Sequence, residues 1–165
     1  MNHASSREPA DGDLFEDATV AIQRLRERAL AQAMQVAREY SEERTRLQIA
    51  EGDSFIATII EVRARNEARS IQILWRSQHY RFGKLIATTD LKGRKRGEAS
   101  YDLTVLKSQV PPWARNLVRD YEQKLRLIRE ALQRLTEIDE HLAVVTRRLN
   151  DDQLDHQGED AHDAT

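Results

Sequence analysis

The stretch "SFIATIIEVRAR", residues 54–65, marks the place where the hydrophobic pattern of the chain changes its period. From Ile56 to Ala64 every second residue can face one side, and β-branched residues dominate. A period of two with this composition is typical of a β-strand. Before and after residues 54–107, apolar residues recur at spacings of three and four, as in an amphipathic helix. The chain therefore divides into a helix, a sheet region and a second helix.

The first long helix is predicted for residues 13–51. Its apolar residues keep the helical spacing, and Asp13 followed by Glu16 forms an acidic variant of the capping box. Gly52 suits the position after the last helical turn. The polar residues 1–12 ahead of this helix are expected to form a disordered acidic tail.

The sheet region, residues 54–107, is predicted to hold three or four antiparallel strands. Turn residues such as those of "NEAR" (66–69) and Gly83 interrupt the apolar pattern at short intervals. Such short connections favour an antiparallel meander, because a parallel pair needs a long crossover. The predicted strands after the first are "SIQILWRSQHY" (70–80), "KLIATTD" (84–90) and "YDLTVL" (101–106).

The second long helix is predicted for residues 111–149. In "QVPPWARNLV" (109–118) the prolines suit a first helical turn, and apolar residues then keep a helical spacing to Leu149. At 1.5 Å per residue this helix is ~55–60 Å long, which is more than a small sheet can cover. We therefore expect the helices to be coiled-coil-like in part and to form a homodimer. Residues 150–165 are expected to be a second disordered acidic tail.

The predicted fold class is α+β, with one domain, residues 13–149, in which two long helices flank a small antiparallel sheet. Charge is strongly segregated along this chain. Residues 54–134 carry seventeen Lys and Arg against eight Asp and Glu, a net charge of +9, whereas residues 1–17 carry −4 and residues 150–165 carry −6. Such asymmetry indicates an anionic partner for the basic middle. Acidic ends that serve only solubility are the plainer interpretation of the tails.

The densest group of cations lies in "DLKGRKRGEAS", residues 90–100. Lys92, Arg94, Lys95 and Arg96 stand there beside glycines that would let the backbone approach a surface. Cations with aromatic residues on an exposed sheet suit contacts with the phosphates and stacked bases of DNA. The alternative is that basic loops are common and that strand-edge cations prevent sheets from aggregating. The predicted DNA-binding set is completed by Arg63, Arg65, Arg76, Arg81 and Lys84, interleaved with Trp75, His79, Tyr80 and Phe82.

Cations also follow the second helix, but several have acidic neighbours at helical spacing. Glu122 with Arg126, and Glu130 with Arg134, are spaced to form i, i+4 ion pairs. We therefore expect a solvated, self-compensated helix face there and no primary DNA contact.

The sequence carries no catalytic signature. It has no cysteine, its five histidines are scattered, and it contains no Gly-rich phosphate loop, G-x-S-x-G or H-E-x-x-H pattern. We therefore expect no enzyme activity, no cofactor and no bound metal. No apolar run approaches the ~20 residues that span a bilayer, and the start of the sequence has no apolar signal region. A cytoplasmic protein without membrane contact is expected.

Several short motifs resemble the MobI-type proteins of conjugative elements. They are a strand with Ile73, Trp75 and Arg76, the basic residues 92–96, and Trp113 followed by a helix. The resemblance covers about residues 55 to 132. It departs from the family pattern where an arginine follows the first Trp directly and where "AR" replaces the acidic residues expected after the second. The helix carries the family run of Glu122, Leu125, Ile128 and Arg129.

This resemblance implies an accessory mobilisation factor of conjugative transfer. Such proteins act at the origin of transfer together with the relaxase and carry no nicking chemistry. The implication agrees with a basic, oligomeric protein that binds double-stranded DNA. A protein-interaction module that assembles a complex through its helices, without nucleic acid, remains the alternative. Co-purifying nucleic acid that high salt removes would separate the two.

Overall fold

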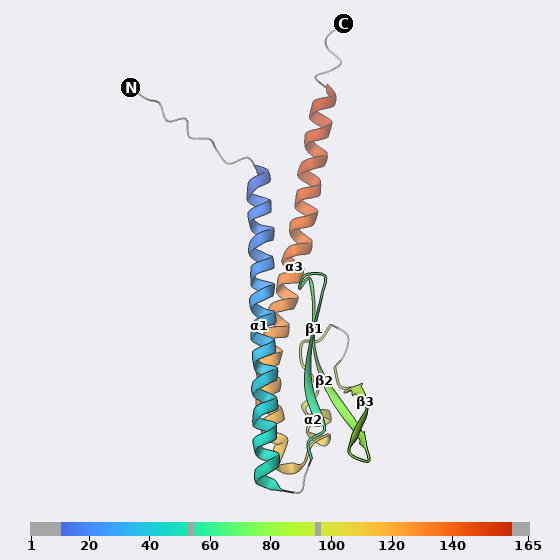
Figure 1. Cartoon of the computed structure of the whole chain (residues 1–165). Helices are drawn as coiled ribbons and strands as arrows, with labels where there is room; N and C mark the ends of the chain where they lie inside the picture. The colour runs from blue at the N-terminus through green and yellow to red at the C-terminus, as the bar shows by residue number, and fades with distance from the viewer. Residues whose placement is uncertain (1–10, 53–54, 95–96, 160–165) are drawn as a thin grey trace, which may run out of the picture. The chain divides into compact units, whose positions relative to one another are not determined.

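The computed structural model describes residues 11–52, 55–94 and 97–159 of the chain (Figure 1). It confirms the α+β class, the long helices and an antiparallel sheet, which has three strands in the order β1-β2-β3. The elements in chain order are α1 (Asp11–Glu51), β1 (Thr58–Arg65), β2 (Ser70–Arg81), β3 (Lys84–Asp90), α2 (Leu103–Ser108), the short 3-10 turn η1 (Pro112–Ala114) and α3 (Arg115–Glu159).

Each long helix extends beyond one of its predicted bounds, but the predicted start of the second at residue 111 is wrong, because Pro112–Ala114 form the 3-10 turn η1 and α3 begins at Arg115. α1 begins at Asp11, and α3 continues past residue 149 to Glu159. The extension of α3 is reasonable because residues 150–157 contain no proline or glycine that would end a helix. The rest of the two predicted tails, residues 1–10 and 160–165, lies outside the described residues.

The described chain forms two compact units. Residues 26–133 form the larger unit, which contains the sheet, α2 and the adjoining parts of α1 and α3. Residues 11–25 and 134–159 form the other unit from the remaining parts of the two helices. The residues of the predicted DNA-binding set that the structure describes belong to the larger unit.

The sheet is the meander that the short connections predict. β1 pairs with β2 antiparallel, with Arg65 opposite Ser70 beside the turn. β2 pairs with β3 antiparallel, with Arg81 opposite Lys84. Because side chains alternate between the two faces of a strand, one face of β1 and β2 is apolar and packs on the helices, while the other carries the charged residues.

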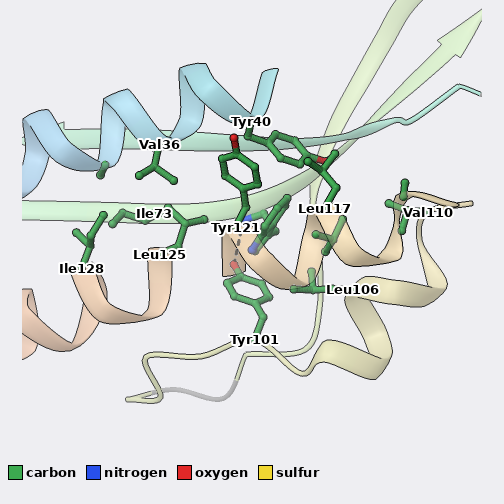
Figure 2. Packing of buried hydrophobic residues seen from close by; sticks show 14 of the residues in the cluster. Val36, Tyr40, Ile73, Tyr101, Leu106, Val110, Leu117, Tyr121, Leu125 and Ile128 are labelled. Atoms are coloured by element: carbon green, nitrogen blue, oxygen red, sulfur yellow. Dashed lines mark hydrogen bonds between the residues drawn. The ribbon is translucent and has the colours of Figure 1, made fainter. Parts of the chain in front are cut away.

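The apolar core lies between the sheet and the helices. Trp75 on β2 is completely buried, and the ring of Tyr40 on α1 meets it edge-on, with 5.0 Å between ring centres. The same Tyr40 ring lies 5.3 Å from the ring of Tyr121 on α3, so both helices and the sheet share one cluster (Figure 2). Each large apolar side chain buried there contributes about 1.5–3 kcal/mol. The cluster also includes Val36 from α1, Ile73 from β2, and Leu117, Leu125 and Ile128 from α3.

The predicted fourth strand, "YDLTVL" (101–106), is wrong, because Leu103–Ser108 form the helix α2. Oδ1 of Asp102 accepts a hydrogen bond at 2.7 Å from the backbone N–H of Thr104 and so caps the first turn. A six-residue apolar run does not distinguish a strand from a buried helical turn by its period alone. The sheet therefore ends at Asp90 and not at residue 107.

Candidate nucleic-acid interface

The predicted DNA-binding cations that the structure describes lie in three parts of the larger unit. The first is the face of β1 and β2 that points away from the helices, the second is the tip of the β2–β3 hairpin, and the third is the loop after β3. Lys95 and Arg96 lie outside the described residues. The others are Arg63, Arg65 and Arg76 in the sheet, Arg81 and Lys84 at the hairpin tip, and Lys92 and Arg94 in the loop.

On the outer face of the sheet, Arg63 and Arg76 are engaged with acids. Glu61 accepts a hydrogen bond at 2.5 Å from Nε of Arg63 and another from Nη1 of Arg76. Nε of Arg76 lies 2.8 Å from Oδ1 of Asp90, and its Nη2 donates to the backbone carbonyl of Thr88 at 2.8 Å. The hydrogen bonds from Arg63 and Arg76 lower the pKa of the Glu61 carboxyl. Arg76 therefore ties the three strands together, and acidic neighbours compensate its charge.

Residues 91–102 are here named the basic loop, and hydrogen bonds to backbone carbonyls hold its described parts, residues 91–94 and 97–102. The carbonyl of Gly93 accepts a hydrogen bond at 2.7 Å from the last residue of the loop, and the carbonyl of Gly97 accepts one at 2.8 Å from Nε2 of Gln133 on α3. Gly93 has a φ of 123°, and a Cβ there would lie 3.1 Å from Cβ of Val105 on α2. The lack of a side chain at Gly93 therefore allows the backbone of the basic loop to approach α2.

A buried charge pair holds the C-terminal part of the basic loop. Glu122 and Arg129 on α3 are 3% and 4% exposed, and two hydrogen bonds of 2.7 and 3.0 Å join their carboxylate and guanidinium. The same carboxylate accepts hydrogen bonds from Nε1 of Trp75 at 2.6 Å and from the backbone N–H of Tyr101 at 2.8 Å. Arg129 also donates to the backbone carbonyl of Ala99. This network joins α3, β2 and the basic loop.

Burial dominates the electrostatics of the network. It raises the pKa of the Glu122 carboxyl, and the charge of Arg129 and the hydrogen bonds from Tyr101 and Trp75 oppose that rise. Removing two charges from water costs several kcal/mol per ion, which only good hydrogen-bond geometry offsets. Four donors converge on the Glu122 carboxylate, so the loss of one partner would strand the other charge in the interior.

The partner of Glu122 differs from the sequence-based expectation. Glu122 binds Arg129, seven residues later, whereas Arg126 pairs with Glu130 at 3.2 Å on the exposed surface. An i, i+4 spacing describes neighbours on an isolated helix. The spacing alone does not reveal that the basic loop covers Glu122 in the folded protein and excludes water from it.

The described cations of the basic loop are presented to solvent. Lys92 and Arg94 are exposed, and the guanidinium of Arg94 lies 5.6 Å from the centre of the Tyr101 ring. A hollow lined in part by Arg94 and Tyr101 also includes the acids Glu98 and Asp102. Its charge is mixed, so the hollow itself is a poor site for a small anion.

The β2–β3 hairpin extends beyond the part of β2 that packs on the helices (Figure 1). Every residue from His79 to Ala87 is exposed. Trp75, which we expected among residues that could stack on bases, is completely buried and cannot do so. Tyr80 is 45% exposed and Phe82 is 92% exposed. The exposed turn position of Phe82 could have been predicted from "RFGK" (81–84), because Phe-Gly occupies the two turn positions between paired strands.

Several of the residues that carry the family resemblance gather around the buried network. Trp75, Glu122 and Arg129 belong to it, and Leu125 and Ile128 pack in the adjoining core. Other residues of the resemblance lie outside the network: Trp113 in η1 is partly buried against the apolar cluster, and Arg76 lies on the outer face of the sheet. Arg65, from the predicted DNA-binding set, is exposed at the end of β1.

Two kinds of feature are absent from the part of the chain that the structure describes. No helix there is long and apolar enough to cross a membrane. No group of three or more His, Cys, Asp or Glu residues is placed there to hold a metal ion.

A family model described as MobI, MobI protein, matches residues 26–143, which is more than half of the chain. The match contains all of the segment 55–132 on which the resemblance rests, and it takes in the larger part of α1 as well. Neither a curated protein nor a solved structure matches the chain at a significant level.

Proposed function

This chain belongs to the MobI family, which implies a role in conjugative mobilisation, and we propose that it acts there as a non-enzymatic DNA-binding accessory factor. It binds double-stranded DNA at the origin of transfer and helps to recruit or position the relaxase. The basic loop supplies the main phosphate contacts, through Lys92, Arg94, Lys95 and Arg96.

The observation that carries this proposal is the buried network beneath the basic loop. Glu122 and Arg129 are almost fully buried, and they hydrogen-bond to the loop at Tyr101 and Ala99. A buried ion pair adds little net stability compared with a well-packed apolar replacement. Stability alone is therefore a weak reason for its presence. Holding a cationic loop in one conformation is a better reason, because a preorganised loop loses less conformational entropy on binding.

The hairpin tip supplies a second group of cations, Arg81 and Lys84. β3 runs from Lys84 to Asp90, so the tip and the basic loop lie at opposite ends of this strand, ~20 Å apart at 3.3 Å per residue. That separation corresponds to ~6 base pairs of duplex at 3.4 Å each. Both groups can therefore contact the phosphates of one DNA site.

The proposed interface is smaller than the set predicted from the sequence. Arg63 and Arg76 are left out, because Glu61 and Asp90 compensate their charges. The remaining cations of the predicted set are exposed or belong to the basic loop. The proposed contacts are Arg65, Arg81, Lys84, Lys92, Arg94, Lys95 and Arg96.

A salt titration with matched double variants tests this function. Lys92→Ala with Arg94→Ala removes two cations from the basic loop. Arg119→Ala with Arg126→Ala removes two cations from α3, where each has an acidic partner within 3.2 Å. Each phosphate contact contributes ~0.9 to the slope of log affinity against log salt. We expect the loop variant to lower that slope by up to ~2 units and the α3 variant to leave it unchanged.

The DNA probes are a duplex that carries the origin region of the host element and a random duplex of equal length. A loop variant with the wild-type slope would remove the basic loop from the interface. No binding to either duplex at ~50 mM salt, where phosphate contacts are strong, would favour the protein-interaction module instead.

We also propose that the protein is a homodimer joined through a coiled-coil-like stripe on α3. Ile138, Val145 and Leu149 are 48%, 45% and 42% exposed, with the half-buried Leu142 between the first two. Their successive spacings of four, three and four residues are those of a heptad seam. Light scattering should give twice the chain mass of 19.1 kDa, and Val145→Asp should halve it. Val144→Asp, beside the stripe, is the matched control, and a monomeric wild type would contradict the dimer.

A further inference from the structure

The tip of the β2–β3 hairpin, residues 81–84, combines an exposed aromatic ring with flanking cations. Phe82 is 92% exposed, and Arg81 and Lys84 stand opposite each other beside it. The guanidinium of Arg81 lies 5.3 Å from the centre of the Phe82 ring. Single exposed apolar residues are normal on protein surfaces. This one, however, is placed at the end of a two-stranded ribbon, between two positive charges.

Phe82 also occupies a backbone conformation that disfavours it. Its φ is 50° and that of Gly83 is 74°, so both turn residues lie in the left-handed region, as in a type I′ hairpin turn. Such turns prefer Asn-Gly or Gly-Gly, and a bulky residue at positive φ is uncommon. Formation of the hairpin therefore does not account for the phenylalanine. Backbone outliers of this kind cluster at functional sites.

The ribbon behind the tip is braced and lined with polar groups. Phe55 packs edge-on against Tyr80, with 5.2 Å between ring centres, and the hydroxyl of Tyr80 donates to Oε1 of Gln78. Across the ribbon, Nε2 of His79 lies 2.8 Å from Oγ1 of Thr89. Such groups suit the base edges and sugars of a DNA groove. A lipid surface would bury them at a cost in free energy.

We propose that the hairpin tip enters a groove of double-stranded DNA and that Phe82 wedges between two adjacent base pairs, kinking the duplex. Arg81 and Lys84 neutralise phosphates on the two sides of the kink. Two-stranded ribbons fit DNA grooves, and apolar side chains inserted between base steps unstack and bend DNA. This inference rests on the proposed DNA-binding function. It adds to that function a deformation of the bound site.

Phe82→Asn separates the wedge from folding. Asparagine is preferred at this turn position, so the variant should unfold at the same temperature as the wild type or at a higher one. Ile86→Ala is the matched control, because Ile86 is 61% exposed on β3 but lies outside the tip. The probe is a duplex of ~25 base pairs with a fluorophore at each end and 2-aminopurine at a central T-A step, since pyrimidine–purine steps kink easily.

The wild type and Ile86→Ala are expected to shorten the distance between the fluorophores and to raise the aminopurine fluorescence. Phe82→Asn should do neither and should bind about 10- to 100-fold more weakly, as for the loss of one stacking contact. Its salt slope should stay unchanged, because no cation is removed.

Three outcomes would overturn the wedge, and they differ in whether the proposed DNA binding survives. Phe82→Asn that bends and unstacks the duplex like the wild type would overturn the wedge and leave DNA binding intact. A wild type that binds no duplex would overturn the proposed function and the wedge together. Binding to anionic phospholipid vesicles that depends on Phe82, without duplex bending, would also overturn the wedge and assign the tip to a membrane surface.

Discussion

Replacing Arg129 by methionine should destabilise the protein by about 3–5 kcal/mol, the usual cost of removing one partner of a buried ion pair. The substitution keeps a long side chain but leaves Glu122, 3% exposed, with only Trp75 and Tyr101 as donors. It also removes the hydrogen bond to Ala99 and the contact of the guanidinium with the Tyr101 ring at 5.2 Å. Since whole domains are stable by about 5–15 kcal/mol, this one change should remove a large part of the total.

A double-mutant cycle shows whether the pair acts as a unit. Glu122→Leu strands the Arg129 charge and should cost a similar amount. The double variant holds neither charge but leaves Nε1 of Trp75 and the N–H of Tyr101 unsatisfied, at ~1–3 kcal/mol each. Its total cost should therefore lie well below the sum of the single costs. With single costs of about 3–5 kcal/mol each and about 2–6 kcal/mol for the double variant, the coupling free energy should be about 4 kcal/mol.

Urea unfolding followed by tryptophan fluorescence measures these free energies, because Trp75 lies inside the network. Arg126→Met is the matched control: it lies three residues away on α3, its side chain is 52% exposed, and it pairs with Glu130 on the surface. It should cost less than ~0.5 kcal/mol. Single costs that add in the double variant, or a cost below ~1 kcal/mol for Arg129→Met, would refute the network as a structural unit.

Three other changes have definite expected outcomes. Hydrogen bonds from Arg63 and Arg76 lower the folded-state pKa of Glu61. The ionised Glu61 carboxylate therefore stabilises the fold fully above its unfolded pKa, and this stabilisation is lost as pH falls through the folded pKa. The melting temperatures of wild type and Glu61→Gln should converge at acid pH, and a difference independent of pH would contradict this. Burial and the hydrogen bond to Glu43 raise the pKa of Tyr121 to about 12. The melting temperature of the wild type should therefore exceed that of Tyr121→Phe by its full amount below pH ~10, and the difference should shrink as pH rises towards 12. Gly93→Ala should cost about 1–3 kcal/mol, because φ is 123° and the added Cβ would lie 3.1 Å from Val105. Gly52→Ala, at φ 76° with no atom within 4 Å, is the control without a clash and at a backbone conformation that other residues adopt more readily, so it should cost less, and equal losses in urea unfolding would contradict the prediction.

Most of the fold could be predicted because its signals are local. Ile73 and Trp75 alternate with Leu74 and Arg76, and such a period identifies a strand with one buried face whatever lies against it. The segment "YDLTVL" gives no such signal, since its helix depends on the Asp102 cap and on burial of Leu106. The positions of the long helices and of the three strands along the chain were therefore easier to predict than the conformation of the short apolar segment 101–106.

The candidate site was less predictable, because charge compensation depends on tertiary neighbours. Arg63 and Arg65 lie on the same strand and point to the same face, yet Arg63 has Glu61 at 2.5 Å while Arg65 stands exposed at the strand end. The sequence located the basic loop correctly but could not show that Glu122 and Arg129 lie beneath it. A count of cations therefore does not show which of them have acidic partners in the fold.

Arg129→Met should also weaken DNA binding, although Arg129 is only 4% exposed and is too buried to serve as a phosphate contact. Without it, Ala99 loses its hydrogen bond, while Tyr101 stays bound to Glu122, so Ala99 and Ser100 must become ordered when DNA binds. Ordering costs ~1–2 kcal/mol of backbone entropy per residue, so two freed residues would lower the affinity by ~2–4 kcal/mol, roughly 30-fold or more. The salt slope should not change, because the bound state still contacts the same phosphates. Binding is measured where circular dichroism shows the variant to be folded, with Arg126→Met as control. A lower slope in Arg129→Met would mean that loop cations have left the interface, and wild-type affinity would mean that the network does not position the loop.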